Sequence, residues 1–243
     1  MSLRVARRRL LSSSASLLAA VACCAIPRTG FALAEDLGPS TDMLPRPPDA
    51  RLLSSNFRLV VPFRTQKDGG RWQTSNCGPA TLGMLLDGYG IGGHETDDLR
   101  VQMHTYQGTL GMRTGTGLEH VAHVAEDLGV RTHGLYNPDG SYRTWQAGDV
   151  EAELRQGRPV MPLVRLYLVP GYEALASRWG HYILLTGITP DGFVFSDSLK
   201  TDPTPGTTGL ISRQQLAVAI ANSHIPGQAA AYSGPRDLPI LTA

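Results

Sequence analysis

A single cysteine stands at the start of a helix-like segment, where a thiol is well placed to act as a nucleophile. Cys77 opens the stretch CGPATLGMLLDGYG, in which Pro79 suits a first helical turn and the closing glycines suit a helix end. Helix N-termini carry partial positive charge, which favours the thiolate, the reactive form of the side chain. The N–H group of Cys77 could donate to an oxyanion, and Gly78 would let a substrate approach the backbone closely. The predicted chemistry is attack of a sulfur anion on a carbonyl carbon.

A thiol nucleophile needs a base, and the base needs a group that orients it. His181 opens the strand-like run HYILLTGI, and Asp197 lies near the end of the next run, FVFSDS. If a hairpin turns at Thr189, midway between them, the two side chains face each other on one side of the sheet. A polar histidine at a strand edge and an aspartate that ends a strand are the alternatives. Taken in the order Cys77, His181, Asp197, the residues predict a Cys–His–Asp triad.

Two tryptophans flank the segments that carry these residues. Trp72 lies just before Cys77, and Trp179 lies just before Gly180 and His181. The two indole rings could wall a substrate cleft, with Gly180 and Gly78 between them and the reacting groups. Packing in the core is the alternative for both rings.

The histidines elsewhere in the chain do not predict a metal site. His120 and His123 are three residues apart on an expected helix, a spacing that can bind a metal ion. No third ligand is evident near them in the sequence. We therefore expect no metal site.

The pattern of elements around the candidate residues indicates an α+β domain. Most of the helix-like segments precede the strand-like ones, which argues against alternating βαβ units. Capping boxes are predicted at Thr116 with Glu119 and at Ser212 with Gln215. The expected helices lie at residues 77–90, 95–106, 114–130, 149–157 and 212–223. The expected strands lie at residues 56–63, 158–169, 181–188 and 193–198.

Residues 1–34 have the features of a removable bacterial export signal. Four arginines precede an apolar run from Leu10 to Ile26, and a small-x-small cleavage pattern follows at 32–34. The run is short and broken by serines, so no permanent membrane span is predicted. The motif RRRLL is similar to a twin-arginine signal, which would direct a folded protein out of the cytoplasm. A lipid anchor at Cys23, in the stretch AVACC, is the alternative to a free periplasmic or secreted protein.

The remaining chain divides into three expected parts. Residues 35–55 are rich in proline and polar residues and are expected to form a flexible linker. A single domain is expected from 56 to 225, followed by a tail at 226–243. The formal net charge of +1 and the lack of a basic stripe argue against a nucleic-acid partner. Removal of the signal would leave Cys77 as an unpaired thiol, which is inert and buried, bridged to another chain, or reactive.

Several stretches resemble a known family of enzymes. VPFRTQKDGGRWQTSNCGPATLGMLLDGYG, RPVMPLV, GHYILLTGI and FVFSDS are similar to papain-fold cysteine peptidases related to bacteriocin-leader-processing enzymes, the C39-like family. The resemblance runs from about residue 60 to about residue 198, and NCGPA and GHYILL are its most specific parts. It implies a papain-like α+β fold with a nucleophile helix packed on an antiparallel sheet. It also implies hydrolysis of an amide bond without a metal or organic cofactor.

The resemblance also implies roles for individual residues. It makes Cys77 the nucleophile, His181 the general base and Asp197 the residue that orients the base. The family has an upstream glutamine whose side-chain amide donates to the oxyanion. Gln66 is the first choice for that role, and Gln73 is the second.

This sequence also departs from the family pattern. Ser198 follows Asp197 where many relatives have Asp-Pro. The processing members are fused to membrane transporters, whereas this chain has no predicted span and carries a predicted export signal. Leader removal is therefore not the expected task. The expected function is that of an exported thiol hydrolase, a monomer that acts on a peptide or protein substrate. A cell-wall amidase or transpeptidase on a related fold, and a non-catalytic binding domain that kept the fold, are the alternatives.

Overall fold

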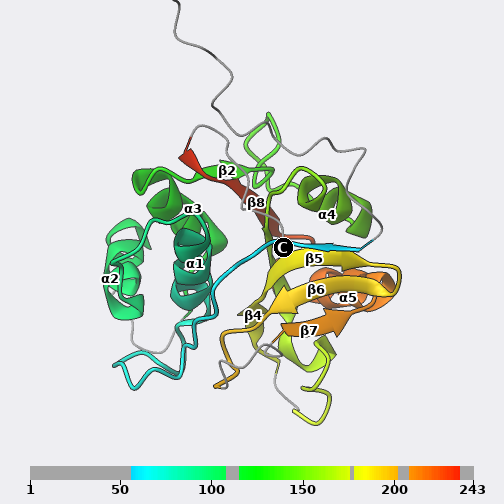
Figure 1. Ribbon diagram of the computed structural model, residues 1–243, viewed down its shortest axis with the longest axis horizontal. Helices are drawn as coiled ribbons and strands as arrows, with labels where there is room; N and C mark the ends of the chain where they lie inside the picture. Colours follow the sequence, from blue (N-terminus) through cyan, green and yellow to red (C-terminus); the bar gives the residue numbers. More distant parts are fainter. Residues whose placement is uncertain (1–55, 108–114, 176–177, 202–207, 236–243) are drawn as a thin grey trace, which may run out of the picture. The chain divides into compact units, whose positions relative to one another are not determined.

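The computed structural model describes residues 56–107, 115–175, 178–201 and 208–235, which are coloured in Figure 1. The expected signal at 1–34 and the expected linker at 35–55 lie outside the described residues. The helices are α1 (Cys77–Gly88), α2 (Thr96–Gln107), α3 (Leu118–Asp127), α4 (Ala147–Leu154), the 3-10 helix η2 (Leu166–Leu168) and α5 (Arg213–Ala221). The strands are β1 (Phe57–Arg58), β2 (Arg131–His133), β3 (Val160–Arg165), β4 (Gly180–Tyr182), β5 (Leu184–Thr189), β6 (Gly192–Ser196), β7 (Thr208–Ile211) and β8 (Ala229–Ser233).

The described strands form one antiparallel sheet. Its order is β2-β8-β3-β5-β6-β7, with β1 paired to β5 and β4 paired to β3. The strand β8 therefore lies inside the sheet, between β2 and β3. The expectation that a tail begins at residue 226 is wrong, because residues 229–233 belong to the folded sheet.

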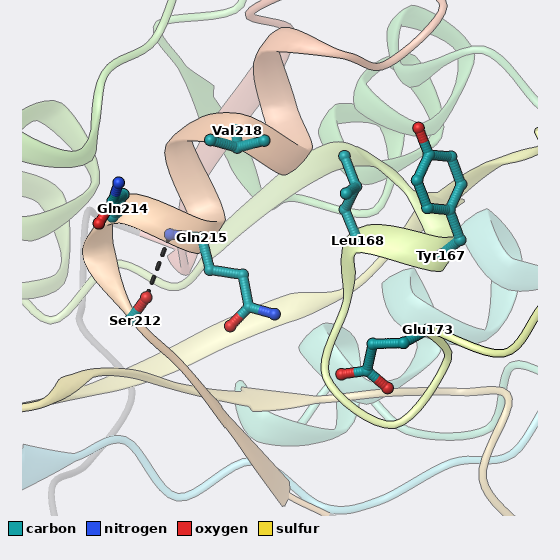
Figure 2. Close-up of a pocket in the computed structure, with 7 residues that line it drawn as sticks. All are labelled: Tyr167, Leu168, Glu173, Ser212, Gln214, Gln215 and Val218. Carbon is teal, nitrogen blue, oxygen red and sulfur yellow. Dashed lines mark hydrogen bonds between the residues drawn. The ribbon is translucent and has the colours of Figure 1, made fainter.

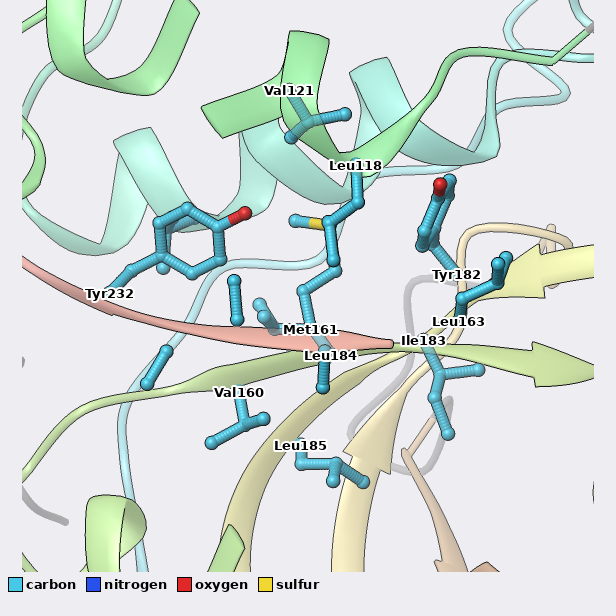
Figure 3. Packing of buried hydrophobic residues seen from close by; sticks show 14 of the residues in the cluster. Leu118, Val121, Val160, Met161, Leu163, Tyr182, Ile183, Leu184, Leu185 and Tyr232 are labelled. Carbon is cyan, nitrogen blue, oxygen red and sulfur yellow. The ribbon is translucent and has the colours of Figure 1, made fainter. Parts of the chain in front are cut away.

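The sheet is covered by helices on both faces. Helices α1, α2 and α3 lie together beside the strands, and α4 and α5 lie against β3 and β5 (Figure 1). Figure 3 shows Met161, Tyr182 and Tyr232 on the face nearer to α1 and α3, with Val160 and Leu185 on the opposite face. Strands β3, β5 and β8 are accordingly buried along nearly their whole length, as expected for strands that are packed on both sides.

Helix α1 begins at Cys77, as the sequence predicts. The helix buries nearly all of its first three turns against its neighbours, which fixes the direction of its N-terminus. Gly78 lies in a place that has no room for a side chain, because a Cβ atom there would be 2.3 Å from Oγ1 of Thr116. The N-terminus of α1 therefore packs closely on the segment before α3 at the residue next to Cys77.

One of the two predicted capping boxes is absent. The N-cap of α3 is Gly117, and no side chain caps that helix. Thr116 is instead buried next to Gly78, and its backbone carbonyl accepts a hydrogen bond from the hydroxyl of Tyr182 at 3.1 Å. At α5 the expected cap is present in part, because Oγ of Ser212 accepts from the backbone N–H of Gln215 at 3.1 Å.

The predicted strands are longer than the observed ones. The run 56–63 contains only the two-residue β1, and the run 158–169 changes from β3 into η2. The run 181–188 is interrupted at Ile183, so that β4 pairs with β3 while β5 pairs mainly with β6. Among the described helices, none combines the length and the apolar character that a membrane span requires.

Candidate active site

His181 and Asp197 form a buried pair at one end of the sheet. His181 lies on β4 and is 3% exposed, and Asp197 directly follows β6 and is fully buried. Nε2 of His181 lies 2.7 Å from Oδ1 of Asp197. The carboxylate is held further by the hydroxyl of Tyr172, which donates to Oδ2 at 2.6 Å, and by the backbone N–H of Leu199, which donates to Oδ1 at 2.9 Å. Both oxygens of Asp197 are therefore fixed before any substrate binds.

The hairpin register predicted for this pair is wrong, although the two side chains do meet. The strands β5 and β6 turn between Thr189 and Gly192, which pair with each other, so the turn is not centred on Thr189. His181 pairs with Val164 of β3 and does not face Asp197 across the hairpin. Asp197 lies beyond the last residue of β6, and its side chain reaches the imidazole from there.

Cys77 lies at the first residue of α1 and is half-buried. Its burial by itself raises the pKa of the thiol. The hydrogen bond and charge of His181 and the backbone N–H groups of Tyr182 and Gly78 have the opposite effect, and the pKa of Cys77 is lowered from its ordinary value. These interactions favour the thiolate at the site.

The ring of His181 is shifted in the complementary direction. Burial disfavours the charged ring, but the hydrogen bonds and charges of Asp197 and Cys77 raise the pKa of His181 to about 10. Burial also disfavours the charged form of Asp197 and so raises its pKa. Its hydrogen bonds to His181, Tyr172 and Leu199 outweigh this effect and lower the pKa of Asp197 below its usual value. A thiol pKa that is lowered beside an imidazole pKa that is raised describes a thiolate–imidazolium pair.

Gln66 is buried beside this group and is held at both ends of its amide. Its Nε2 donates to the backbone carbonyl of Gln73 at 3.0 Å, and its Oε1 accepts from the hydroxyl of Ser198 at 3.1 Å. A primary amide carries two N–H groups, so a second hydrogen remains for another acceptor. Gln73 is half-buried and contributes its backbone carbonyl to this arrangement.

The dipeptide Asp197–Ser198 joins the two halves of the group. Asp197 contacts the imidazole, while Ser198 contacts Gln66 through its hydroxyl and through its carbonyl, which accepts from the N–H of Gln66 at 2.8 Å. The serine that departs from the Asp-Pro pattern thus takes part in the hydrogen bonds of the site. Sequence reasoning found the departure but not the contact.

The four residues expected to line a cleft differ in their surroundings. Trp179 is 75% exposed, next to Gly180, where a Cβ atom would lie 2.4 Å from the ring of His224. Trp72 is half-buried, and its ring meets that of His104 edge-on at 6.0 Å. Trp72 thus contacts α2, whereas Trp179 is open to solvent. The fourth residue, Gly78, is buried and lies against Val121 of α3 and Tyr182 of β4.

Sequence reasoning missed several polar residues that support this group. Tyr172 comes from the loop after η2, and nothing in its local sequence indicates a contact with a carboxylate 25 residues away. Asp97 and Arg100 of α2 bind the segment that precedes Cys77. In the sequence they belong to the charged stretch ETDDLR, which is typical of an exposed helix start.

Two further features concern metal binding and a surface pocket. Across the described ranges, no group of three His, Cys, Asp or Glu side chains is arranged to hold a metal ion, and His123 stacks on the ring of Tyr106. A surface pocket lies between η2, the loop after it and α5 (Figure 2). It is lined by Tyr167, Leu168, Glu173, Ser212, Gln214, Gln215 and Val218. The pocket shares no residue with the group around Cys77.

Comparison with known proteins agrees with this architecture. Residues 58–219 match the model of the Peptidase_C39 like family. The chain is similar to a C39-like peptidase from Bacillus anthracis, with 17% identity, a TM-score of 0.50, and coverage of 72% of this chain and 96% of that one. It is also similar to a double glycine motif protease from an AMS/PCAT transporter in complex with its leader peptide, with 14% identity, a TM-score of 0.47, and coverage of 74% and 98%. No curated protein matches the chain. The predicted α+β papain-like fold is confirmed.

Proposed function

The chain belongs to the Peptidase_C39 like family and is a cysteine peptidase-like hydrolase, and from this premise we propose that Cys77, His181 and Asp197 hydrolyse peptide bonds as a triad. The observation that carries the proposal is the buried contact of 2.7 Å between His181 and Asp197, with the half-buried thiol of Cys77 hydrogen-bonded to the same imidazole. Each member has a lowered or raised pKa in the direction that the chemistry requires.

In the resting site the proton of the thiol is carried by the imidazole. Because Nε2 of His181 faces Asp197, the nitrogen left for the sulfur is Nδ1. The thiolate of Cys77 attacks the carbonyl carbon of the substrate, and a C–S bond forms as the carbonyl oxygen becomes an oxyanion. Nδ1–H then donates its proton to the amine nitrogen, and the C–N bond breaks. The amine departs, and the acyl group remains bound to Cys77 as a thioester.

The second half of the reaction returns the site to its first state. Nδ1 of His181 takes a proton from a water molecule, whose oxygen attacks the thioester carbon. The C–S bond breaks, the acid product leaves, and the thiolate and imidazolium are restored. Asp197 stabilises the charged ring and holds its orientation throughout, since its own two oxygens are fixed by Tyr172 and Leu199.

Two donors are proposed for the oxyanion. The N–H of Cys77 belongs to the first turn of α1, whose N–H groups have no partner within the helix, and the second N–H of the Gln66 amide completes the hole. The contacts of Gln66 with Ser198 and with the carbonyl of Gln73 support this assignment over Gln73, because they hold the Gln66 amide in one orientation. A donor that is already oriented requires no reorganisation during the reaction.

We also propose that the enzyme acts outside the cytoplasm on a peptide or protein substrate. The support is the arginine-rich, apolar and small-x-small pattern of residues 1–34. Mass spectrometry of the protein recovered from the host envelope and medium tests this. A mature N-terminus after Ala34 is expected, whereas an acylated N-terminus at Cys23 would indicate a lipid anchor, and an intact Met1 in the cytoplasm would contradict export.

The triad is tested by the rate of iodoacetamide alkylation at different pH values, for the wild type and for His181→Ala. Fast alkylation below pH 7 that is lost in the variant is expected. Slow alkylation with the pH profile of a free thiol in both proteins would contradict the proposal and favour a binding domain. Assays on unstructured peptides and on purified peptidoglycan, run in parallel, separate peptide hydrolysis from cell-wall amidase activity.

A further inference from the structure

The segment that leads into the nucleophile is held from α2 by three hydrogen bonds. Nη1 of Arg100 donates to the carbonyl of Ser75 at 2.8 Å. Oδ1 of Asp97 accepts from Nδ2 of Asn76 at 2.8 Å, and its Oδ2 accepts from the backbone N–H of Arg71 at 2.9 Å. Asp97 and Arg100 are three residues apart, so both side chains leave the same face of α2. One face of α2 therefore holds the segment before α1 at both of its ends, at Arg71 and at residues 75–76.

Arg100 carries a charge in a fully buried place. Its side chain has no exposed surface, and its Nε donates to Nε2 of His104 at 2.6 Å. An imidazole that accepts at this nitrogen is neutral, and burial together with the charge of Arg100 lowers the pKa of His104. A buried guanidinium is costly unless anions or strong acceptors surround it. Two anions among the described residues that interact with it are Asp97 and the thiolate of Cys77.

From this arrangement we propose that Arg100 is a positioning residue of the active site, which fixes the start of α1 through Ser75 and favours the thiolate form of Cys77 by its charge. Asp97 fixes the same segment and offsets part of that charge. The inference rests on the proposed function, because it concerns the same nucleophile. Arg100 acts from α2, whereas His181 acts from β4, so the thiolate interacts with a permanent cation in addition to a titratable one.

Electrostatic coupling between the two side chains supports this role. Burial lowers the pKa of Arg100, and the charges of Cys77 and Asp97 act against that shift. A cation close to a thiol favours its charged form in turn. Within the described part of the chain, the other titratable groups that interact with the thiol or the guanidinium come from α2 and β4: Asp97, His104, His181 and Tyr182.

Two substitutions of opposite charge test the proposal through the pH profile of alkylation. Arg100→Met is expected to raise the midpoint for Cys77 by about one pH unit, so that alkylation below the midpoint is about tenfold slower. Asp97→Asn removes the neighbouring negative charge and is expected to lower the midpoint. Simple loosening of the segment would move both midpoints in the same direction. Opposite shifts support the proposal, and equal directions or unshifted midpoints overturn it.

Controls keep the test decisive. Arg213→Met removes a cation that contacts Glu151 and the carbonyl of Thr189, and it is expected to leave the midpoint unchanged. Arg100→Lys keeps the charge and is expected to keep the midpoint near that of the wild type. If Arg100→Met does not fold, as judged by its thermal transition, Asp97→Asn decides: a lowered midpoint supports the proposal, and any other result overturns it. A wild-type profile like that of a free thiol would instead contradict the proposed function itself.

Discussion

The nucleophile lies on a helix that begins at Cys77, whereas the base lies on the short strand β4 and its carboxylate directly follows β6. The thiol needs only the N-terminus of α1, which is a local feature of the sequence. The imidazole and carboxylate meet because β4 ends at Tyr182, Ile183 interrupts the run, and Asp197 follows the last residue of β6. The first side is thus specified by neighbours in the chain, and the second by the packing of distant segments.

The two sides also differ in how their polar atoms are held. On the sheet side, Asp197 receives hydrogen bonds from His181, Tyr172 and Leu199 within a fully buried place. On the helix side, the thiol of Cys77 is half-buried and depends on the helix start and on α2 for its position. A change on the sheet side is therefore expected to disturb both stability and the ionisation of the base, while a change at the thiol affects chemistry alone.

The largest effect is expected from Cys77→Ala. The substitution removes the nucleophile and leaves the packing of α1 intact, so peptide hydrolysis is expected to fall by about 10⁴-fold or more. The thermal midpoint is expected to change little, since the thiol is only half-buried. Hydrolysis of a fluorogenic peptide and calorimetry measure the two quantities. Residual activity close to that of the wild type would show that another group attacks the substrate.

Next in size is Asp197→Asn, which removes the carboxylate on the sheet side. We expect kcat to fall by about two orders of magnitude, less than the roughly 10⁴-fold loss seen when a serine triad loses its carboxylate, because a thiol ionises more readily. An asparagine of the same shape limits the loss of packing. Calorimetry is expected to show a lower thermal midpoint here, in contrast to Cys77→Ala, because a buried ionic partner of His181 is removed.

The same variant has a defined effect on the pH profile. Activity requires the thiolate and the imidazolium together, so it is expected to rise as pH passes the lowered pKa of Cys77 and to fall as pH passes the raised pKa of His181, about 10. An anion beside the ring favours its charged form. Removal of that anion lowers the pKa of His181, and the alkaline limb is expected to move to lower pH. An alkaline limb that stays in place would mean that Asp197 does not act on the imidazole.

The same difference between local and distant contacts decides which features the sequence predicts. The predicted start of α1 is confirmed, because Cys77, Gly78 and Pro79 are adjacent and together favour a helix N-terminus through local preferences. The register of the hairpin is not predicted correctly, because Thr189 pairs with Gly192, so the turn lies at residues 190–191, and because His181 belongs to β4, which pairs with β3 and not with β6.

The missed elements depend in the same way on distant contacts. The strand β8 has the sequence AAAYS, and alanine has a low preference for strands, so only burial between β2 and β3 accounts for it. Arg100 follows two aspartates in a stretch that is typical of an exposed helix, yet it is fully buried. Its environment depends on the segment before Cys77, which no local pattern reveals.

A smaller and more selective loss is expected from Gln66→Ala, which separates ionisation of the thiol from stabilisation of the transition state. Loss of one donor to the oxyanion lowers kcat by about 10²-fold to 10³-fold in comparable sites. Alkylation by iodoacetamide forms no oxyanion, so its rate is expected to match that of the wild type. Gln73→Ala is the matched control, because Gln73 contributes its backbone carbonyl to Gln66. A larger loss of kcat in the Gln73 variant would reverse the assignment of the oxyanion donor.

The smallest effect is expected from Ser198→Ala, at the residue that links Asp197 to Gln66. The hydroxyl donates to Oε1 of Gln66 at 3.1 Å, but the amide keeps its contact with the carbonyl of Gln73, and the backbone of Ser198 still accepts from the N–H of Gln66. One neutral hydrogen bond contributes about 1 kcal/mol, so kcat is expected to fall by no more than about fivefold, with KM and alkylation unchanged. Ser198→Thr, which keeps the hydroxyl, controls for the loss of the donor. A shift in the alkylation profile of Ser198→Ala would show that the serine acts through Asp197 on the ion pair, and not through Gln66 on the oxyanion.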